Sequence, residues 1–95
     1  MLIHCLTLTF KESATPTQVE AFRAALAALP EQVGVPIVTR QGPDIGERAT
    51  NADYAVVSEF ESTDDFHTYL AHPAHLAVPR DHVESVHGVQ FVVEA

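Results

Sequence analysis

The sequence predicts an α+β fold, because segments with the two-residue period of a strand alternate with segments that repeat at helical spacing. Three observations carry this prediction: an alternating stretch near the start, a helix-capping signature directly after it, and later strand patterns that enclose more helical sequence. The chain has 95 residues, of which 46% are hydrophobic, and this is enough for one domain with a core. We therefore predict a single domain over residues 1–95, of a size that oligomerisation commonly stabilises.

The first two predicted elements are a strand and a helix. Residues 2–10 alternate between a strongly apolar face and a mixed face, which is typical of a strand with one face in the core. The motif "TPTQ" follows, in which Thr15 is an N-cap and Gln18 can complete a capping box. Helical spacing then continues until Pro30, which we expect to end the helix. The apolar positions of this helix are Val19, Phe22, Leu26 and Leu29.

Three more strands are predicted. They cover residues 35–41, 53–61 and 88–94. The turn-forming loop over 42–51 is long enough to form a rim or lid.

Two helical segments lie between the last two strands. One begins after Ser62 or Thr63 as the cap, and the other runs from Pro73 until Pro79 interrupts it. The inner stripe of the first is predicted to be Phe66, Tyr69 and Leu70. The order is therefore βαββ(α)αβ, and four strands with helices on one face form an α+β sandwich of ferredoxin-like type.

The sheet face turned away from the helices is predicted to be an interface. It is expected to carry Ile3, Cys5, Val57 and Val92, and no helix is left to cover it. An uncovered apolar face of this kind favours contact with a second subunit. We predict a homodimer through the sheet face.

Charge and cysteine content exclude several partners. The formal net charge is −8, from 13 acidic and 5 basic residues, so a nucleic acid or an anionic membrane would be repelled. Cys5 is the sole cysteine, which favours a reducing compartment. The first ten residues have neither the basic start of a signal peptide nor the length of a membrane span, so we expect a cytoplasmic protein.

The stretch "YLAHPAH", residues 69–75, gathers the candidate site. Tyr69 lies on the inner face of its helix, and His75 follows Pro73 near the start of the next helix. A helix N-terminus and partial burial both disfavour imidazolium, so His75 is expected to be neutral and able to accept a proton. His4, on the apolar face of the first strand, is expected to join them between sheet and helices. His72 precedes a proline at the helix break and completes the group.

Each of these residues also has a purely structural interpretation. A histidine before proline is often a capping group, a histidine on an apolar strand face is often a hydrogen-bonded core residue, and a tyrosine on a helix stripe often only packs. The histidines lack the grouping of a metal site, and the four glycines stand singly in turns rather than in a phosphate-binding loop. We expect no metal and no cofactor.

Three motifs add a resemblance to a family. "H-x-L-x-L-x-F" in the first strand, "DYAVVSEF" in the third and "F-x-x-Y-L-A-H-P-A-H" at the helix break resemble the stress-responsive A/B barrel domain (Dabb) family over nearly the whole chain. The resemblance implies a dimeric α+β barrel. The family includes a plant polyketide cyclase whose catalytic tyrosine and histidine match Tyr69 and His75, and a further pocket histidine matches His4. Val56 replaces a third-strand histidine of that enzyme, and Pro79 interrupts a helix that usually continues.

Two classes of function remain open at this point. In the first, the protein is a cyclase for a linear poly-β-ketone, in which His75 removes a proton, Tyr69 orients it and stabilises the enolate, and His4 binds a carbonyl. In the second, it is a non-enzymatic dimer that binds a hydrophobic small molecule or acts in a stress response. The cavity for either ligand is expected to be lined by Phe22, Leu26, Val56 and Phe66.

Overall fold

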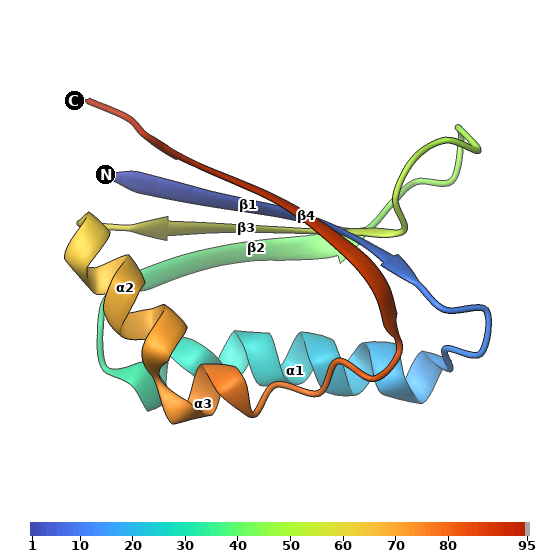
Figure 1. Ribbon diagram of the computed structural model, residues 1–95, viewed down its shortest axis with the longest axis horizontal. Helices are drawn as coiled ribbons and strands as arrows, with labels where there is room; N and C mark the ends of the chain where they lie inside the picture. Colours follow the sequence, from blue (N-terminus) through green and yellow to red (C-terminus); the bar gives the residue numbers. More distant parts are fainter. Residues whose placement is uncertain (95) are drawn as a thin grey trace.

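A four-stranded antiparallel sheet with helices on one face forms the molecule (Figure 1). The computed structural model describes residues 1–94. The elements are β1 (Leu2–Phe10), α1 (Pro16–Val33), β2 (Ile37–Pro43), β3 (Tyr54–Phe60), α2 (Thr63–Ala71), α3 (Pro73–Leu76) and β4 (Val83–Val92). The strand order is β2-β3-β1-β4, so the ferredoxin-like α+β fold predicted from the sequence is confirmed.

Helix α1 begins as predicted but ends later. The Thr15 side chain accepts from the Gln18 backbone N–H, and the Gln18 side chain accepts from the Thr15 N–H, which is the predicted capping box. The helix does not end at Pro30, because a proline in the last turn removes only one backbone hydrogen bond. It ends at Gly34, whose φ of 80° suits a residue without a Cβ and whose N–H donates to the Pro30 carbonyl.

Strand β4 begins five residues earlier than the predicted 88–94. The segment Val83–His87 pairs with β1, where Val83 lies opposite Phe10 and a register shift follows between Thr9 and Phe10. A bulge of this kind hides a strand start, because it breaks the two-residue period on which the prediction depends. Strand β2 covers 37–43 instead of 35–41, and β3 is shorter than predicted by one residue at each end.

The core lies between the inner sheet face and the helices. Leu29, Val56 and Phe60 are almost completely buried there, as are Phe22 and Leu26 of α1. Leu70 is wrongly placed by the sequence pattern: it is 37% exposed on α2, while Phe66 and Tyr69 form the buried stripe. Within residues 1–94, no helix is long and apolar enough to cross a membrane.

The outer sheet face is apolar, but one of its predicted members is wrong. Cys5 pairs with Val57 on one side and Val89 on the other, and Ile3 pairs with Phe91, so these five side chains share that face. Val92 pairs with Leu2 and therefore points to the inner side of the sheet. The prediction failed because residues 91–93 are all apolar, so the sequence pattern does not show which of them shares a face with Cys5, and only the pairing with β1 decides it.

Candidate functional site

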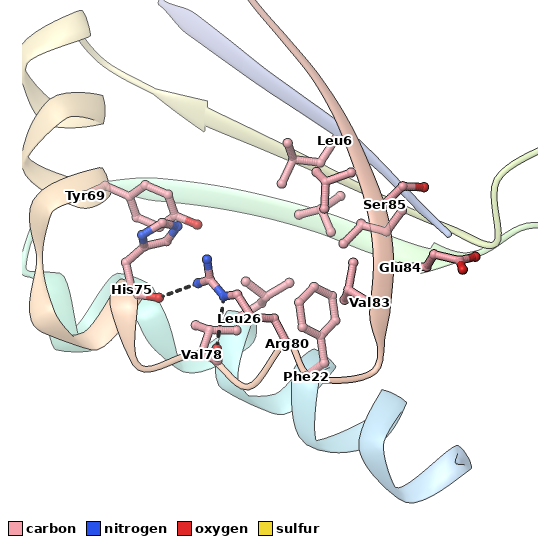
Figure 2. A pocket seen from close by; sticks show the side chains of 13 residues that line it. Leu6, Phe22, Leu26, Tyr69, His75, Val78, Arg80, Val83, Glu84 and Ser85 are labelled. Atoms are coloured by element: carbon pink, nitrogen blue, oxygen red, sulfur yellow. Dashed lines mark hydrogen bonds between the residues drawn. The ribbon is translucent and has the colours of Figure 1, made fainter. Parts of the chain in front are cut away.

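An apolar cavity of about 290 Å³ lies between the inner sheet face, α1 and the segment that connects α3 to β4. Leu6 and Val56 come from the sheet, and Phe22 and Leu26 come from α1. Figure 2 shows Tyr69 and His75 together at one end of this cavity and Phe22 and Val83 toward the other. The volume is at the lower limit of small-molecule sites, so the cavity suits a small, mostly apolar ligand.

The helix break brings Tyr69 and His75 together. His72 is the C-cap of α2 and the N-cap of α3, and its Nδ1 accepts the Ala74 backbone N–H at 3.0 Å. The chain turns at this residue because the following Pro73 disfavours helical geometry before it. As a result the rings of Tyr69 and His75 lie with centroids 4.5 Å apart.

The hydrogen bond of His75 determines which ring nitrogen is available. Its Nδ1 lies 3.2 Å from the Leu70 carbonyl oxygen, which can only accept. We therefore assign the proton of the neutral ring to Nδ1, which leaves Nε2 as a proton acceptor. Burial lowers the pKa of His75, and the nearby Arg80 cation lowers it further, while the Leu70 carbonyl acts in the opposite direction.

The pKa of His75 is lowered as predicted from the sequence, but only one of the two predicted causes acts. Burial contributes as expected. Helix α3 has only four residues, and His75 also belongs to its last turn, so the helix dipole does not favour a neutral ring there. Arg80 takes the place of the dipole as the second cause.

Tyr69 presents its hydroxyl as a donor. The side chain is 5% exposed, and its ring packs against Phe60 at a centroid distance of 5.1 Å. Among the described residues the hydroxyl has no hydrogen-bond partner, and it is not among the fully buried unpartnered atoms. Burial raises the pKa of Tyr69, and the Arg80 cation offsets part of this rise, so the phenol keeps its proton near neutral pH.

His4 lies beside this pair without lining the cavity. Its ring packs against Phe66 at 4.9 Å and lies 6.4 Å from the Tyr69 ring. The Gln90 amide nitrogen donates to His4 Nδ1 at 2.9 Å, so we assign the proton of His4 to Nε2. Burial lowers the pKa of His4, and the proximity of His75 lowers it further.

Five of the eight predicted site residues line the cavity, and three do not. Those that line it are Phe22, Leu26, Val56, Tyr69 and His75. His4 packs against the ring of Phe66, and His72 is occupied as a cap, and these three residues lie outside the lining.

Sequence reasoning missed the wall formed by the start of β4. Arg80, Val83 and Ser85 line the cavity, although this segment was expected to be a connection. Val83 and Val86 were the available signal, but the two polar residues between them do not alternate, because the bulge adds Glu84 to β4 opposite Thr9 and Phe10 of β1.

The remaining buried histidine has a structural position. His82 is 3% exposed and lies between the rings of Phe10 and Phe22, at centroid distances of 5.2 and 5.4 Å. Its Nε2 is buried without a partner among the described residues. In that part of the chain no three His, Cys, Asp or Glu side chains are grouped to hold a metal ion.

The fold and the cavity define a small ferredoxin-like α+β protein with a ligand-sized apolar cavity behind its sheet. The chain belongs to the stress responsive A/B barrel domain (Dabb) family, whose model matches residues 2–94. The match confirms the family that the three sequence motifs indicated. A search of curated proteins found no match.

Several solved structures share this fold. A dimeric ferredoxin-like protein of unknown function from Thermobifida fusca is 32% identical with a TM-score of 0.83, covering 97% of this chain and 90% of its own. The Passiflora edulis hydroxynitrile lyase is 19% identical with a TM-score of 0.86, covering 98% and 93%. The Arabidopsis thaliana protein At3g17210 is 22% identical with a TM-score of 0.85, covering 100% and 97%. The last two likenesses show the fold alone.

Proposed function

We propose that this protein is a cofactor-free catalyst of aldol-type ring closure, acting on a linear poly-β-ketone. One observation carries the proposal: the unprotonated Nε2 assigned to His75 accompanies a Tyr69 hydroxyl without a protein partner, in a mostly apolar cavity. A base and a hydrogen-bond donor side by side are what enolate chemistry requires.

The proposed reaction balances without an added reagent. His75 Nε2 takes a proton from a carbon between two carbonyls, and the C–H electron pair becomes an enolate whose oxygen accepts a hydrogen bond from Tyr69. The enolate carbon then attacks a distant carbonyl of the same chain, so a carbon–carbon bond forms and that carbonyl oxygen becomes an alkoxide. The imidazolium of His75 returns its proton to this oxygen. General base catalysis contributes roughly 10²–10⁴-fold to such a rate.

The walls of the cavity support a folded, apolar substrate. Phe22, Leu26 and Val56 present no hydrogen-bonding side-chain groups, so this part of the wall suits the apolar portion of a substrate. The substrate contact that the sequence suggested for His4 is not part of the proposal, because His4 does not line the cavity.

We further propose that the protein acts as a homodimer through its outer sheet face. Val38, Val89 and Phe91 are 54%, 57% and 47% exposed on this face, and in the described residues no helix covers it. Several structural neighbours are described as dimeric ferredoxin-like proteins. Cys5 on the same face is a free thiol, which suits the cytoplasm.

A second candidate is a non-catalytic dimer that binds a small molecule. It is favoured by the contacts that already occupy the two rings, since His75 bonds the last turn of α2 and Tyr69 packs on Phe60. In this case both residues serve the fold, and the cavity only holds its ligand.

Turnover separates the two candidates. The protein is incubated with a linear triketide or tetraketide thioester, and cyclised product is followed by mass spectrometry. Ring closure should be lost in His75→Ala and Tyr69→Phe and kept in His67→Ala, which removes an exposed histidine of α2 outside the cavity. Turnover that survives both cavity changes, or that is absent from the unaltered protein across such substrates, contradicts the cyclase proposal and leaves the binding protein.

A further inference from the structure

Arg80 is the one lysine or arginine among the residues that line the cavity. Eight of the other twelve lining residues are apolar, and the chain as a whole carries a net charge of −8. Arg80 is exposed to solvent, so its guanidinium is hydrated where it borders the cavity and is accessible to an anion that enters there.

The backbone holds the Arg80 guanidinium in place. Nη2 donates to the His75 carbonyl at 2.8 Å, and Nε donates to the Val78 carbonyl at 3.2 Å. Both carbonyls lie in the segment that follows α2, so the fork is anchored next to the proposed base. Two of the five N–H groups are used in this way, and the others stay free to bind a ligand.

No protein carboxylate neutralises this cation. Within residues 1–94 the ion pair found is that of Arg23 with Glu20 on α1, and Arg80 has no acidic group within 4.0 Å. Glu84 also lines the cavity, but Figure 2 shows its carboxylate directed away from Arg80. The guanidinium therefore borders the cavity with solvent, and not a protein carboxylate, around its free N–H groups.

The field of Arg80 reaches both rings of the proposed pair. Its charge lowers the pKa of His75 and opposes the rise in the pKa of Tyr69. Figure 2 shows the guanidinium between these rings and the Phe22 end of the cavity, with its third nitrogen directed toward the side on which the Tyr69 hydroxyl lies. A carboxylate bound to Arg80 would thus lie on the side of the cavity that holds Tyr69, and the apolar part of the same ligand would lie against Leu26 and Val56.

We propose that the ligand of this cavity is an amphipathic carboxylate, an apolar chain or ring whose carboxylate is bound by the Arg80 fork. This deepens the proposed function and rests on it in taking the cavity as the substrate site: the substrate or product would carry a free carboxylate. A planar guanidinium matches a carboxylate with two parallel hydrogen bonds, which an ester, alcohol or amine cannot accept in the same way. The net charge of the chain opposes anion binding, so any preference for a carboxylate must arise locally.

The test compares octanoate with octan-1-ol, which share an apolar chain and differ in charge. Both are titrated into the unaltered protein by calorimetry at about pH 7.5, where the carboxylic acid is ionised. Octanoate should bind at least about tenfold more tightly than octan-1-ol, because charge-assisted pairs are roughly twice as strong as neutral hydrogen bonds. Equal affinities, or binding of neither compound, would overturn the proposal.

Two variants locate the preference. Arg80→Gln should lose the preference for octanoate while octan-1-ol binding stays within about twofold, since only the charged contact is removed. Arg48→Gln, which removes the same charge from the exposed β2–β3 loop, should keep the full preference. If Arg80→Gln does not fold, Arg80→Lys serves instead: it keeps the charge without the fork and should retain part of the preference. Full preference in either Arg80 variant contradicts the assignment.

The outcome is independent of turnover. A carboxylate preference without any ring closure would support this inference and refute the cyclase. Ring closure without a carboxylate preference would support the cyclase and refute this inference.

Discussion

Replacing Tyr69 by phenylalanine separates a catalytic hydroxyl from a packing ring. The change deletes one oxygen and leaves the ring contacts with Phe60 and His75 in place. Because the hydroxyl has no hydrogen-bond partner among the described residues, its removal breaks no protein contact. We expect the free energy of unfolding to change by no more than about 0.5 kcal/mol.

Tyr69→Ala provides the matched contrast. It removes a ring that is 5% exposed and leaves a cavity in the core, for which large-to-small changes of aromatic residues cost about 3–5 kcal/mol. For a domain of this size, about 1 kcal/mol corresponds to a change in melting temperature of roughly 4–8 °C. Tyr69→Phe should therefore melt within about 4 °C of the unaltered protein, and Tyr69→Ala at least about 12 °C lower.

The assay is thermal and urea unfolding followed by far-ultraviolet circular dichroism, together with turnover on the same samples. The proposed role of the hydroxyl predicts a loss of about 10²–10³-fold in ring closure for Tyr69→Phe with an unfolding curve close to the original. A loss of several kcal/mol in Tyr69→Phe would refute the reasoning, because it would show that the hydroxyl supports the fold.

Two further predictions concern assembly and pH. Val57→Asp should convert the dimer to monomer, since it places an unpaired charge in the proposed interface. Thr17→Asp, on the exposed first turn of α1, is the control and should leave the dimer intact. Sedimentation velocity at micromolar concentration checks both variants, and a dimeric Val57→Asp would contradict the interface. The pKa values of His4 and His75 are lowered in the folded protein, so below about pH 6.5 the unfolded chain binds more protons, and the free energy of unfolding decreases as the pH is lowered. Urea midpoints at about pH 7.5 and about pH 5.5 test this, and an unchanged or higher midpoint at the lower pH would contradict it.

Local patterns were sufficient to predict most of the fold. The two-residue period of β1, the capping box at Thr15 and the proline after His72 each depend on neighbouring residues alone, and the structure keeps all three. The errors arose where residues beyond the immediate pattern, and not the pattern itself, decide the end of a helix or the face of a strand. Pro30 lies inside α1 because Gly34 provides the helix end, and Val92 changed face because the pairing of β4 with β1 sets its register.

The candidate site shows the same division. The break at Pro73 predicted that Tyr69 and His75 would meet, since both lie within one turn of it. The position of Arg80 could not be predicted, because the path from α3 into β4 decides which side chains reach the cavity. The hydrogen bonds of His75 with Leu70 and of His4 with Gln90 were also beyond a sequence pattern, and they decide which nitrogen of each ring carries the proton.

The central claim is that the cavity keeps His75 neutral with Nε2 unprotonated, and nitrogen-15 NMR of the histidine rings through a pH titration tests it most directly. We expect that His75 titrates below 6.5, that its neutral form carries the proton on Nδ1, and that Arg80→Gln moves its pKa upward because a nearby cation is removed. A His75 pKa at or above 6.5 would contradict the lowering that burial and Arg80 cause, and a neutral form with the proton on Nε2 would leave no ring nitrogen to accept a proton from a ligand beside Tyr69.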